Sequence, residues 1–313
     1  MGAKSMNKVR TAVIGVGYLG KHHARIYSEL ERAHLVAVAD IIEERAQEIA
    51  QRYGCAAYTD YREMLDKETI DAVSVAVPTS LHYEIARDCL LKGISVLVEK
   101  PIATNLEHAD ELFRISREKG LVFQVGYVER FNPIVSYLPR YVDAPYVIMT
   151  KRLCPFVNRN LDVGVVLDLM VHDIDIVLSI VNKEAEEINA KGISVVSIHE
   201  DIASAHIKFK DGCNAYFVVS RVSPTGARKL EIIDREKRII LDYMKKELFI
   251  FDLNGFRSLE HIKLMSSEEP LKKEISFFLE NVISGKNLKE DGRTSFYIAL
   301  KILESIRKSE RNV

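Results

Sequence analysis

The first third of the chain alternates short apolar runs with amphipathic stretches. The apolar runs are nearly continuous, and they occupy residues 9–15, 34–40, 71–77, 94–100 and 121–127. Strands that are buried on both faces of a parallel sheet have this pattern, and the stretches between them have the length of crossover helices. In one of these stretches the apolar side chains follow a helical stripe that ends in Gly93. The pattern predicts an α/β fold that begins with a doubly wound parallel sheet.

The pattern changes after about residue 146. A helical stretch at 167–181 is followed by strand-like segments at 203–210, 214–221, 229–235, 238–244 and 247–253. Because turn signals rather than long helices separate these segments, an antiparallel sheet is favoured. Two amphipathic segments follow, at about 270–284 and 293–308. We expect a first domain at 6–126, counted from a natural start at Met6, and an α+β domain at 127–313 with an open, mostly antiparallel sheet, the final helices being able to pack back on the first domain.

Composition and charge exclude several classes of protein. Among 313 residues, 47% are hydrophobic and 28% charged, which is typical of a globular chain. The 44 Lys and Arg residues are balanced by 45 Asp and Glu residues, so the basic excess of a nucleic-acid-binding protein is missing. No apolar run approaches the roughly 20 residues of a membrane span, so no membrane insertion is expected. The four cysteines, at positions 55, 89, 154 and 213, lack metal-site or disulfide spacing. We therefore expect a cytoplasmic protein without a structural metal.

The first predicted strand leads into a glycine-rich loop. Gly15, Gly17 and Gly20 form a GxGxxG pattern, with Tyr18 and Leu19 between the glycines, and a helical segment follows at once. In this context the first glycine permits a tight turn, the second lets a pyrophosphate approach the backbone, and the third allows close packing of helix and strand. The N–H groups at the helix N-terminus would bind the pyrophosphate. A purely structural glycine turn is the alternative.

Asp40 stands twenty residues after Gly20, where the second predicted strand ends. A carboxylate there accepts hydrogen bonds from ribose hydroxyls and repels a 2′-phosphate, so the predicted cofactor is NAD rather than NADP. No arginine directly follows Asp40, which agrees with NAD. His22 and His23 follow the loop, but adjacent helical side chains point about 100° apart and cannot face one metal together. We expect packing or surface roles for both histidines.

Two further stretches carry candidate chemistry. Glu99 and Lys100 end an apolar strand, and Pro101 holds Lys100 extended at the edge of the sheet where α/β proteins bind ligands. Asp168 and His172, spaced i and i+4, share the polar face of an otherwise apolar helix. Burying an imidazole and a carboxylate is costly without a purpose or partners. Solvated charges at a strand end and a solvated helix stripe are the alternatives.

Taken together, the GVGYLG loop with Asp40, the EKP turn at 99–101 and the DLMVHDID helix at 168–175 resemble the glucose–fructose oxidoreductase, inositol dehydrogenase and rhizopine-catabolism family of NAD(P)-dependent sugar dehydrogenases. The resemblance covers essentially the whole chain and implies a Rossmann domain followed by an α+β domain with an open sheet. It also implies catalytic roles for Lys100, Asp168 and His172. Residues expected by resemblance to contact the cofactor, besides those of the glycine loop, are Pro78, Thr79, His82, Glu99 and Lys100. Of the family's triple-glycine run before the catalytic helix, only Gly164 is present.

The segments VGYVERFNP at 125–133 and DVGVVLDLMVHDID at 162–175 resemble one branch of that family. This branch oxidises the 3-hydroxyl of UDP-N-acetylglucosamine and supplies a 3-keto sugar nucleotide to an aminotransferase in lipid A biosynthesis. By resemblance, Arg130 and Asn132 are candidates for the substrate pocket, with Lys151 and Arg152 as weaker ones. A structural ion pair is an equally good interpretation of Arg130.

The chemistry implied is oxidation of a secondary alcohol, which needs a base within reach of the hydroxyl proton. His172 has a suitable intrinsic pKa, while Lys100 would stabilise the developing alkoxide and Asp168 would orient the pair. The residues alone leave open whether Lys100 or His172 takes the proton. Two other functions remain: a dehydrogenase for a free polyol such as myo-inositol, and an inactive NAD-binding regulator. An uncovered sheet face also predicts a homodimer or homotetramer.

Overall fold

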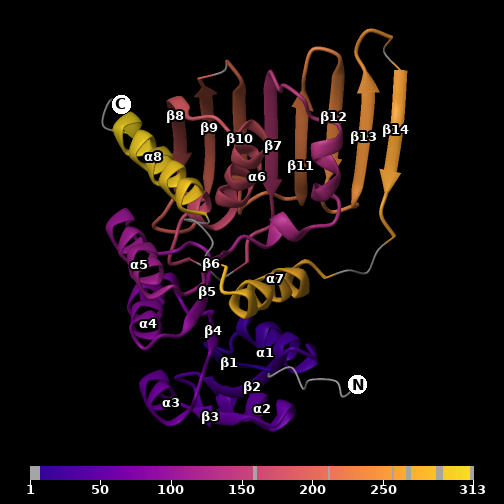
Figure 1. Cartoon of the computed structure of the whole chain (residues 1–313). Helices are drawn as coiled ribbons and strands as arrows, with labels where there is room; N and C mark the ends of the chain where they lie inside the picture. Colours follow the sequence, from indigo (N-terminus) through magenta and orange to yellow (C-terminus); the bar gives the residue numbers. More distant parts are fainter. Residues whose placement is uncertain are drawn as a thin grey trace, which may run out of the picture. The chain divides into compact units, whose positions relative to one another are not determined.

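The structure is a computed structural model that describes residues 8–157, 161–210, 212–255, 257–265, 269–286 and 292–310. The expected start at Met6 lies outside these residues. The chain divides into two compact units (Figure 1). Unit 1 consists of Met1–Gly126 and Leu271–Arg293, and unit 2 of Tyr127–Pro270 and Thr294–Val313. The segment Leu271–Arg293 thus belongs to unit 1, although the predicted boundary at residue 126 places it in the second domain.

Unit 1 contains a six-stranded sheet in the order β3-β2-β1-β4-β5-β6. Its strands are β1 (Val9–Ile14), β2 (Ala33–Ala39), β3 (Ala56–Tyr58), β4 (Ala72–Val75), β5 (Ser95–Glu99) and β6 (Phe123–Gly126). All the pairings are parallel, which confirms the doubly wound sheet predicted from the continuous apolar runs. The strand order reverses between β1 and β4, and open α/β sheets bind ligands at the carboxyl ends of strands beside such a reversal.

Helices cover both faces of this sheet. They are α1 (Gly20–Glu29), α2 (Glu43–Tyr53), α3 (Tyr61–Lys67), α4 (Thr79–Leu91), α5 (Leu106–Lys119) and α7 (Pro270–Ser284). Side chains of α1, α2 and α7 pack in one core cluster with β1 and β2, where Phe278 of α7 is fully buried. Right-handed crossovers place α4 and α5, which contact each other, on the opposite face.

Unit 2 contains an eight-stranded sheet in the order β14-β13-β12-β11-β7-β10-β9-β8. Its strands are β7 (Val147–Leu153), β8 (Ala185–Ile193), β9 (Ile202–Phe209), β10 (Asn214–Ser220), β11 (Ala227–Ile233), β12 (Lys237–Asp242), β13 (Glu247–Asp252) and β14 (Arg257–Lys263). Among the described strands of this second sheet, only the β7–β10 pair is parallel, so the predicted mostly antiparallel sheet is confirmed.

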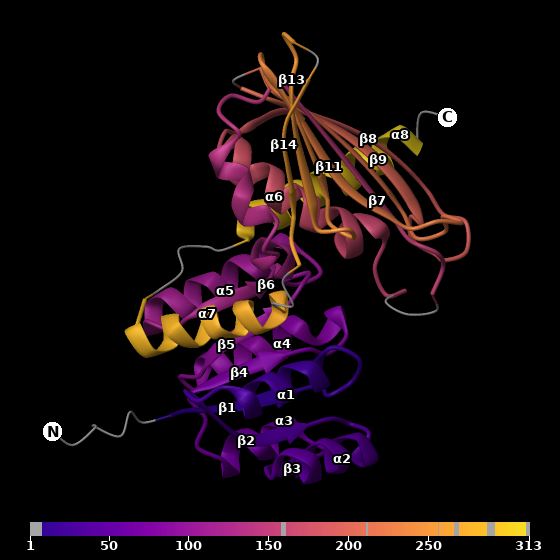
Figure 2. The same cartoon turned by 90° about the vertical axis from the view of Figure 1, so that its right-hand side faces the viewer.

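The helical segments of unit 2 are short, apart from the last. They are the 3₁₀ turns η1 (Val128–Phe131) and η2 (Val135–Arg140), the π-helical turn η3 (Val166–Met170), α6 (Val171–Val181) and α8 (Arg293–Glu310). Helix α6 lies against one side of the sheet (Figure 2). On β7 and β10 the residues that face this side are buried, whereas Met149, Tyr216 and Val218, which alternate with them, are exposed. Among the described residues, no helix has the length and apolar character needed to cross a membrane.

Candidate functional site

The glycine loop between β1 and α1 has the geometry that a bound pyrophosphate requires. Gly15 has a φ of +83°, and a Cβ there would lie 2.6 Å from the carbonyl oxygen of Ala76. A Cβ on Gly20 would lie 1.7 Å from the carbonyl oxygen of Gly15. At Gly17, in contrast, a Cβ would meet nothing within 4 Å, so the space beside this backbone is open. Two glycines thus allow the chain to close on itself, and the third leaves room for a ligand.

Asp40 directly follows β2 and, together with Gly15 and Gly17 of the loop, lines a cavity. Its carboxylate accepts hydrogen bonds from the backbone N–H groups of Val16 (2.9 Å) and Ile42 (3.0 Å), which fixes its orientation beside the loop. The cavity has a volume of about 330 Å³. It is lined by Ile14, Gly15, Gly17, Ala39, Asp40, Ile41, Ile42, Arg45, Thr59, Tyr61, Arg62, Ala76, Val77, Pro78, Leu81, Glu84 and Ile85. The residues therefore fit the adenosine half of NAD, with apolar walls and one carboxylate.

Several of these lining residues carry no sequence signal of their own. Ile41 is 88% exposed, directly after Asp40, and the start of α3 contributes Tyr61 and Arg62. Arg45 also lines the cavity, although no arginine directly follows Asp40 in the sequence. Only the strand order, which brings the start of α3 near the end of β2, reveals these contacts. Tyr18 and Leu19 of the loop are 63% and 38% exposed.

Glu99, at the end of β5, has a partner inside unit 1. Its Oε1 lies 3.0 Å from Nε2 of His23, and Nδ1 of His23 lies 3.0 Å from Oγ of Ser74. Burial raises the pKa of Glu99, but the hydrogen bond from His23 and the charges of His23, Lys100 and His82 outweigh it and bring the pKa below its usual value. Glu99 is therefore a buried, ionised group at the end of β5, and its contact with the cofactor stays a prediction. His23 has the packing role expected for it.

His82 is also buried, with 1% of its surface exposed. Its Nδ1 lies 2.7 Å from the carbonyl oxygen of Pro101, and its Nε2 lies 2.8 Å from that of Val77. A neutral imidazole donates one hydrogen bond, so contact with two carbonyl oxygens is the arrangement of the doubly protonated ring. His82 thus links the segment after β4 to the cis Lys100–Pro101 turn after β5. Both ring nitrogens face protein carbonyls, and the contact of His82 with the cofactor stays a prediction.

The other residues of these two turns differ in exposure. Pro78 is exposed and lines the 330 Å³ cavity, whereas Thr79, the first residue of α4, is 7% exposed. Lys100 is half-buried at the carboxyl end of the sheet. The turn therefore presents a lysine next to a buried carboxylate that pairs with His23.

In unit 2, the predicted helix at 167–181 is a π-helical turn, η3, followed by α6. The N–H of Val171 donates to the carbonyl of Val166, five residues earlier, so the α-helical spacing assumed for Asp168 and His172 does not hold across this turn. Asp168 is half-buried, and His172 is 9% exposed with its ring edge-on to Tyr127 at 6.4 Å between centroids. Such π-turns frequently occur at functional sites.

Arg130 forms a structural ion pair, which was the alternative to a place in the substrate pocket. Its guanidinium makes two hydrogen bonds to Asp175 of α6, which also accepts one from Ser295 (2.6 Å). The Arg130 side chain stays 29% exposed, so pairing leaves part of it accessible to a ligand. Asn132 donates to Glu129 (3.2 Å) and caps the backbone N–H of Ile134 (3.3 Å).

Arg152, expected above as a weaker candidate for the substrate pocket, lies in a buried cluster of ion pairs. It is 3% exposed, and its guanidinium donates to Asp173 (3.0 and 2.8 Å) and to Glu129 (2.9 Å). Burial raises the pKa of Glu129, but the charge of Arg152 outweighs it, and the pKa is lowered. Lys151 is exposed and, since side chains alternate along a strand, lies on the face of β7 opposite Arg152. The two side chains therefore point to opposite faces of the sheet, and a contact of Lys151 with the substrate stays a prediction.

Potential metal ligands do not gather in the described part of the chain: no group of three or more His, Cys, Asp or Glu side chains there could hold an ion. The polar groups of the site are organised instead around hydrogen bonds and ion pairs.

Comparison with known proteins extends these observations. Residues 9–127 match the family model described as "Oxidoreductase family, NAD-binding Rossmann fold" (GFO_IDH_MocA), and residues 145–240 match the "GFO/IDH/MocA C-terminal domain". The chain is 34% identical to UDP-N-acetylglucosamine 3-dehydrogenase of Acidithiobacillus ferrooxidans over 253 residues, which cover 79% of this chain and 78% of the relative. It is 28% identical to myo-inositol 2-dehydrogenase of Thermotoga maritima over 327 residues, covering 96% and 97%.

Solved structures share the fold over nearly the full length. The UDP-N-acetylglucosamine 3-dehydrogenase GnnA of Acidithiobacillus ferrooxidans superimposes with a TM-score of 0.88 at 32% identity, covering 96% of this chain and 98% of that one. A levoglucosan dehydrogenase in complex with NADH superimposes with a TM-score of 0.85 at 20% identity, covering 96% and 98%, a similarity that concerns the fold alone.

Proposed function

Because this chain belongs to the GFO/IDH/MocA family of NAD-binding oxidoreductases, we propose that it oxidises the 3-hydroxyl of UDP-N-acetylglucosamine to a 3-keto sugar nucleotide. The observation that carries the dehydrogenase part is the glycine loop that opens, beside Asp40, into a cavity of nucleoside size. Support for the substrate comes from the 34% identity to a UDP-N-acetylglucosamine 3-dehydrogenase over most of both chains.

NAD, when bound, accepts the hydride that leaves the sugar carbon. In our proposal the chain supplies the acid–base chemistry: His172 takes the hydroxyl proton, and the ammonium of Lys100 donates a hydrogen bond to the same oxygen. Asp168, in the π-turn that precedes His172, orients the imidazole. Lys100 remains an alternative base, since a desolvated lysine can also accept a proton.

For the substrate we propose contacts from Arg130 and Asn132. Arg130 is held by Asp175 yet remains partly exposed, so its guanidinium is pre-oriented for an anionic or polar group of the sugar nucleotide. The product, a ketone on a sugar ring, is a substrate for an aminotransferase, which fits a step in lipid A biosynthesis. The scattered cysteines support a reducing, cytoplasmic setting.

We also propose that the protein acts as a homodimer or homotetramer. The exposed face of the unit 2 sheet carries Met149, Tyr216 and Val218, with exposures of 36%, 44% and 43%. Apolar and aromatic side chains gathered on an uncovered sheet face favour burial against a second copy. Light scattering during size-exclusion chromatography tests the proposal, and a monomer at micromolar concentration contradicts it.

The function is tested by following NADH absorbance with UDP-N-acetylglucosamine and, separately, with myo-inositol. Turnover of the nucleotide sugar supports the proposal. Turnover of myo-inositol alone supports the second candidate, which the 28% identity to a myo-inositol 2-dehydrogenase over 96% of the chain favours. Tight NAD binding without turnover of either substrate points to a regulator.

The catalytic assignment is tested with Lys100→Met and His172→Ala. Each variant should lose about 10²–10⁴-fold in kcat, the usual contribution of a positioned acid or base, while NAD binding stays close to that of the wild type. Lys119→Met and His34→Ala are matched controls, because both side chains are exposed. Rates near those of the wild type in the Lys100 and His172 variants would dismiss the assignment.

A further inference from the structure

The start of the π-turn is held by a residue to which neither the sequence patterns nor the proposed mechanism gives a role. The backbone carbonyl of Glu200 accepts a hydrogen bond from the N–H of Val165 (2.9 Å), and its side-chain Oε1 accepts one from the N–H of Val166 (3.1 Å). The first N–H groups of a helix have no partner within the helix. Glu200 supplies partners for two of them, and its negative charge also suits a helix N-terminus.

The contact between Glu200 and this segment is close. A Cβ on Gly164 would lie 2.0 Å from Oε1 of Glu200 and 2.1 Å from its carboxyl carbon. The carbonyl of Gly164 in turn accepts the N–H of Asp168 (3.0 Å). Gly164 therefore leaves the space in which the Glu200 carboxylate sits, and it bonds directly to the backbone of the proposed orienting residue.

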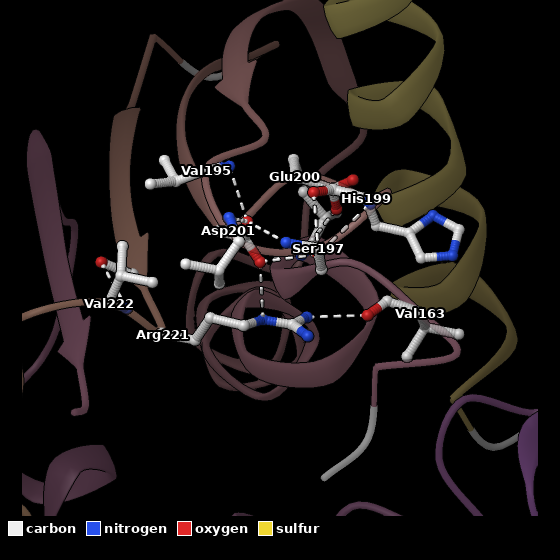
Figure 3. Close-up of polar contacts among 11 residues, drawn as sticks. Val163, Val195, Ser197, His199, Glu200, Asp201, Arg221 and Val222 are labelled. Carbon is white, nitrogen blue, oxygen red and sulfur yellow. Dashed lines mark hydrogen bonds and ion pairs between the residues drawn. The ribbon is translucent and has the colours of Figure 1, made fainter. Parts of the chain in front are cut away.

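The next residue, Asp201, is fully buried, and Figure 3 shows the polar contacts that hold it in the loop. One Asp201 oxygen accepts the backbone N–H groups of Val195 (2.7 Å), Val196 (2.7 Å) and Ser197 (2.9 Å), and the other accepts the Ser197 hydroxyl (2.7 Å). Burial raises the pKa of Asp201, but these hydrogen bonds lower it well below the usual range. The loop that carries Glu200 is thus closed around an ionised carboxylate.

A second connection runs from Asp201 to the residue before Gly164. Arg221 lies 3.7 Å from Asp201 and donates to the carbonyl of Val163 (2.7 Å), as Figure 3 shows. Both ends of the short segment 163–166 are therefore attached to the same loop, one through Arg221 and the other through Glu200. A segment held at both ends has little freedom to change the direction in which the following turn begins.

We propose that Glu200 is a positioning residue for the reaction: it sets the start of the π-turn and thereby the orientation of Asp168 and His172. This inference rests on the proposed roles of those two residues. Glu200 touches neither the substrate nor the cofactor in this scheme, and it acts only through the backbone of residues 164–168.

The first test uses the protein without substrate. The imidazole cross-peak of His172 in a ¹H–¹³C NMR spectrum, assigned with His172→Ala, should move in Glu200→Ala and stay in place in Glu200→Gln, because glutamine retains an acceptor for the Val166 N–H. Glu187→Ala, which removes an exposed glutamate, is the control. Equal movement in the alanine and glutamine variants of Glu200 would mean that charge alone matters, and would overturn the proposal.

The second test measures turnover. Glu200→Ala should lower kcat by about tenfold to hundredfold, the range expected for a misplaced catalytic group, with the NAD dissociation constant unchanged and activity largely restored in Glu200→Gln. Gly164→Ala should behave like Glu200→Ala and serves if that variant does not fold. Wild-type kcat in Glu200→Ala or in Gly164→Ala would contradict the inference. If the wild-type protein turns over neither sugar, the proposed function fails, while the NMR test still decides the role of Glu200.

Discussion

A structural role for Arg152 and a role in substrate binding predict different results when this residue is replaced. Its guanidinium is 3% exposed and makes three hydrogen bonds to two buried carboxylates, those of Asp173 and Glu129. The variant Arg152→Met fills much of the same volume but leaves both carboxylates without their cation. Removing one partner of a buried ion pair typically costs about 3–5 kcal/mol.

The expected fall in the Tm follows from that cost. For a unit of this size, 1 kcal/mol corresponds to roughly 2–4 °C, so the Tm should fall by roughly 6–20 °C. Burial already raises the pKa of Asp173 despite the opposing charge of Arg152. Without Arg152, Asp173 will therefore take up a proton more readily, which moves the cost toward the lower end of the range. The second variant Arg152→Met/Asp173→Asn should recover part of the loss.

Thermal unfolding and steady-state kinetics together decide between the two roles. Lys151→Met is the control, since Lys151 is the exposed neighbour on the opposite face of the strand and its loss should change stability by no more than about 0.5 kcal/mol. If Arg152→Met keeps the wild-type Tm and instead raises KM for the sugar nucleotide many-fold, the structural assignment is wrong. Arg152 would then have to reach the substrate despite its burial.

Three other changes test different parts of the molecule. Gly20→Ala should weaken NAD binding beyond detection by calorimetry, because its Cβ would lie 1.7 Å from the Gly15 carbonyl oxygen; micromolar binding would contradict this. Asp40→Ala should raise the ratio of NADP to NAD turnover by about tenfold or more, because contact between the Asp40 carboxylate and the 2′-phosphate costs several kcal/mol. Arg45, which lines the same cavity, stays available to the phosphate. An unchanged ratio would refute the role of Asp40. Asp201→Asn should strongly lower the free energy of unfolding at pH 7, and the loss should become smaller as the pH falls below about 3.8. The reason is that a carboxylate with a lowered pKa in the folded state contributes stability that is lost when it is protonated. Urea unfolding at pH 7 and pH 3 measures the difference, and a constant difference would exclude a charge-based role.

The sequence predicted those parts of the fold that depend on residues close together along the chain. Continuous apolar runs predicted the parallel strands of unit 1, and the glycine spacing located the loop after β1. Strand β14, by contrast, is exposed at nearly every position, so it has no alternating pattern to detect. Edge strands of this kind are held by backbone pairing to one neighbour, which leaves little trace in the side chains.

The partners of buried polar groups could not be predicted. Glu99 and His23 are 76 positions apart, and Arg152 and Asp173 are 21 apart on different elements. Periodicity shows that a charged residue is buried but not which group compensates it, because that depends on how the elements pack. The sequence also did not predict the π-turn before His172; the start of this turn is bonded to Glu200, which lies 34 positions away along the chain.

The return of α7 to unit 1 affects how the chain is made. Ile275, Phe278 and Leu279 belong to the same apolar cluster as Val13 and Val38 near the start of the chain. During synthesis the first 126 residues therefore leave the ribosome with part of their interior unfilled, and it stays so until some 150 more residues have followed. A fragment ending before Leu271 would keep every glycine of the dinucleotide loop and still lack the helix that closes its core, so premature termination well beyond the Rossmann strands should expose this unit to chaperones and proteases.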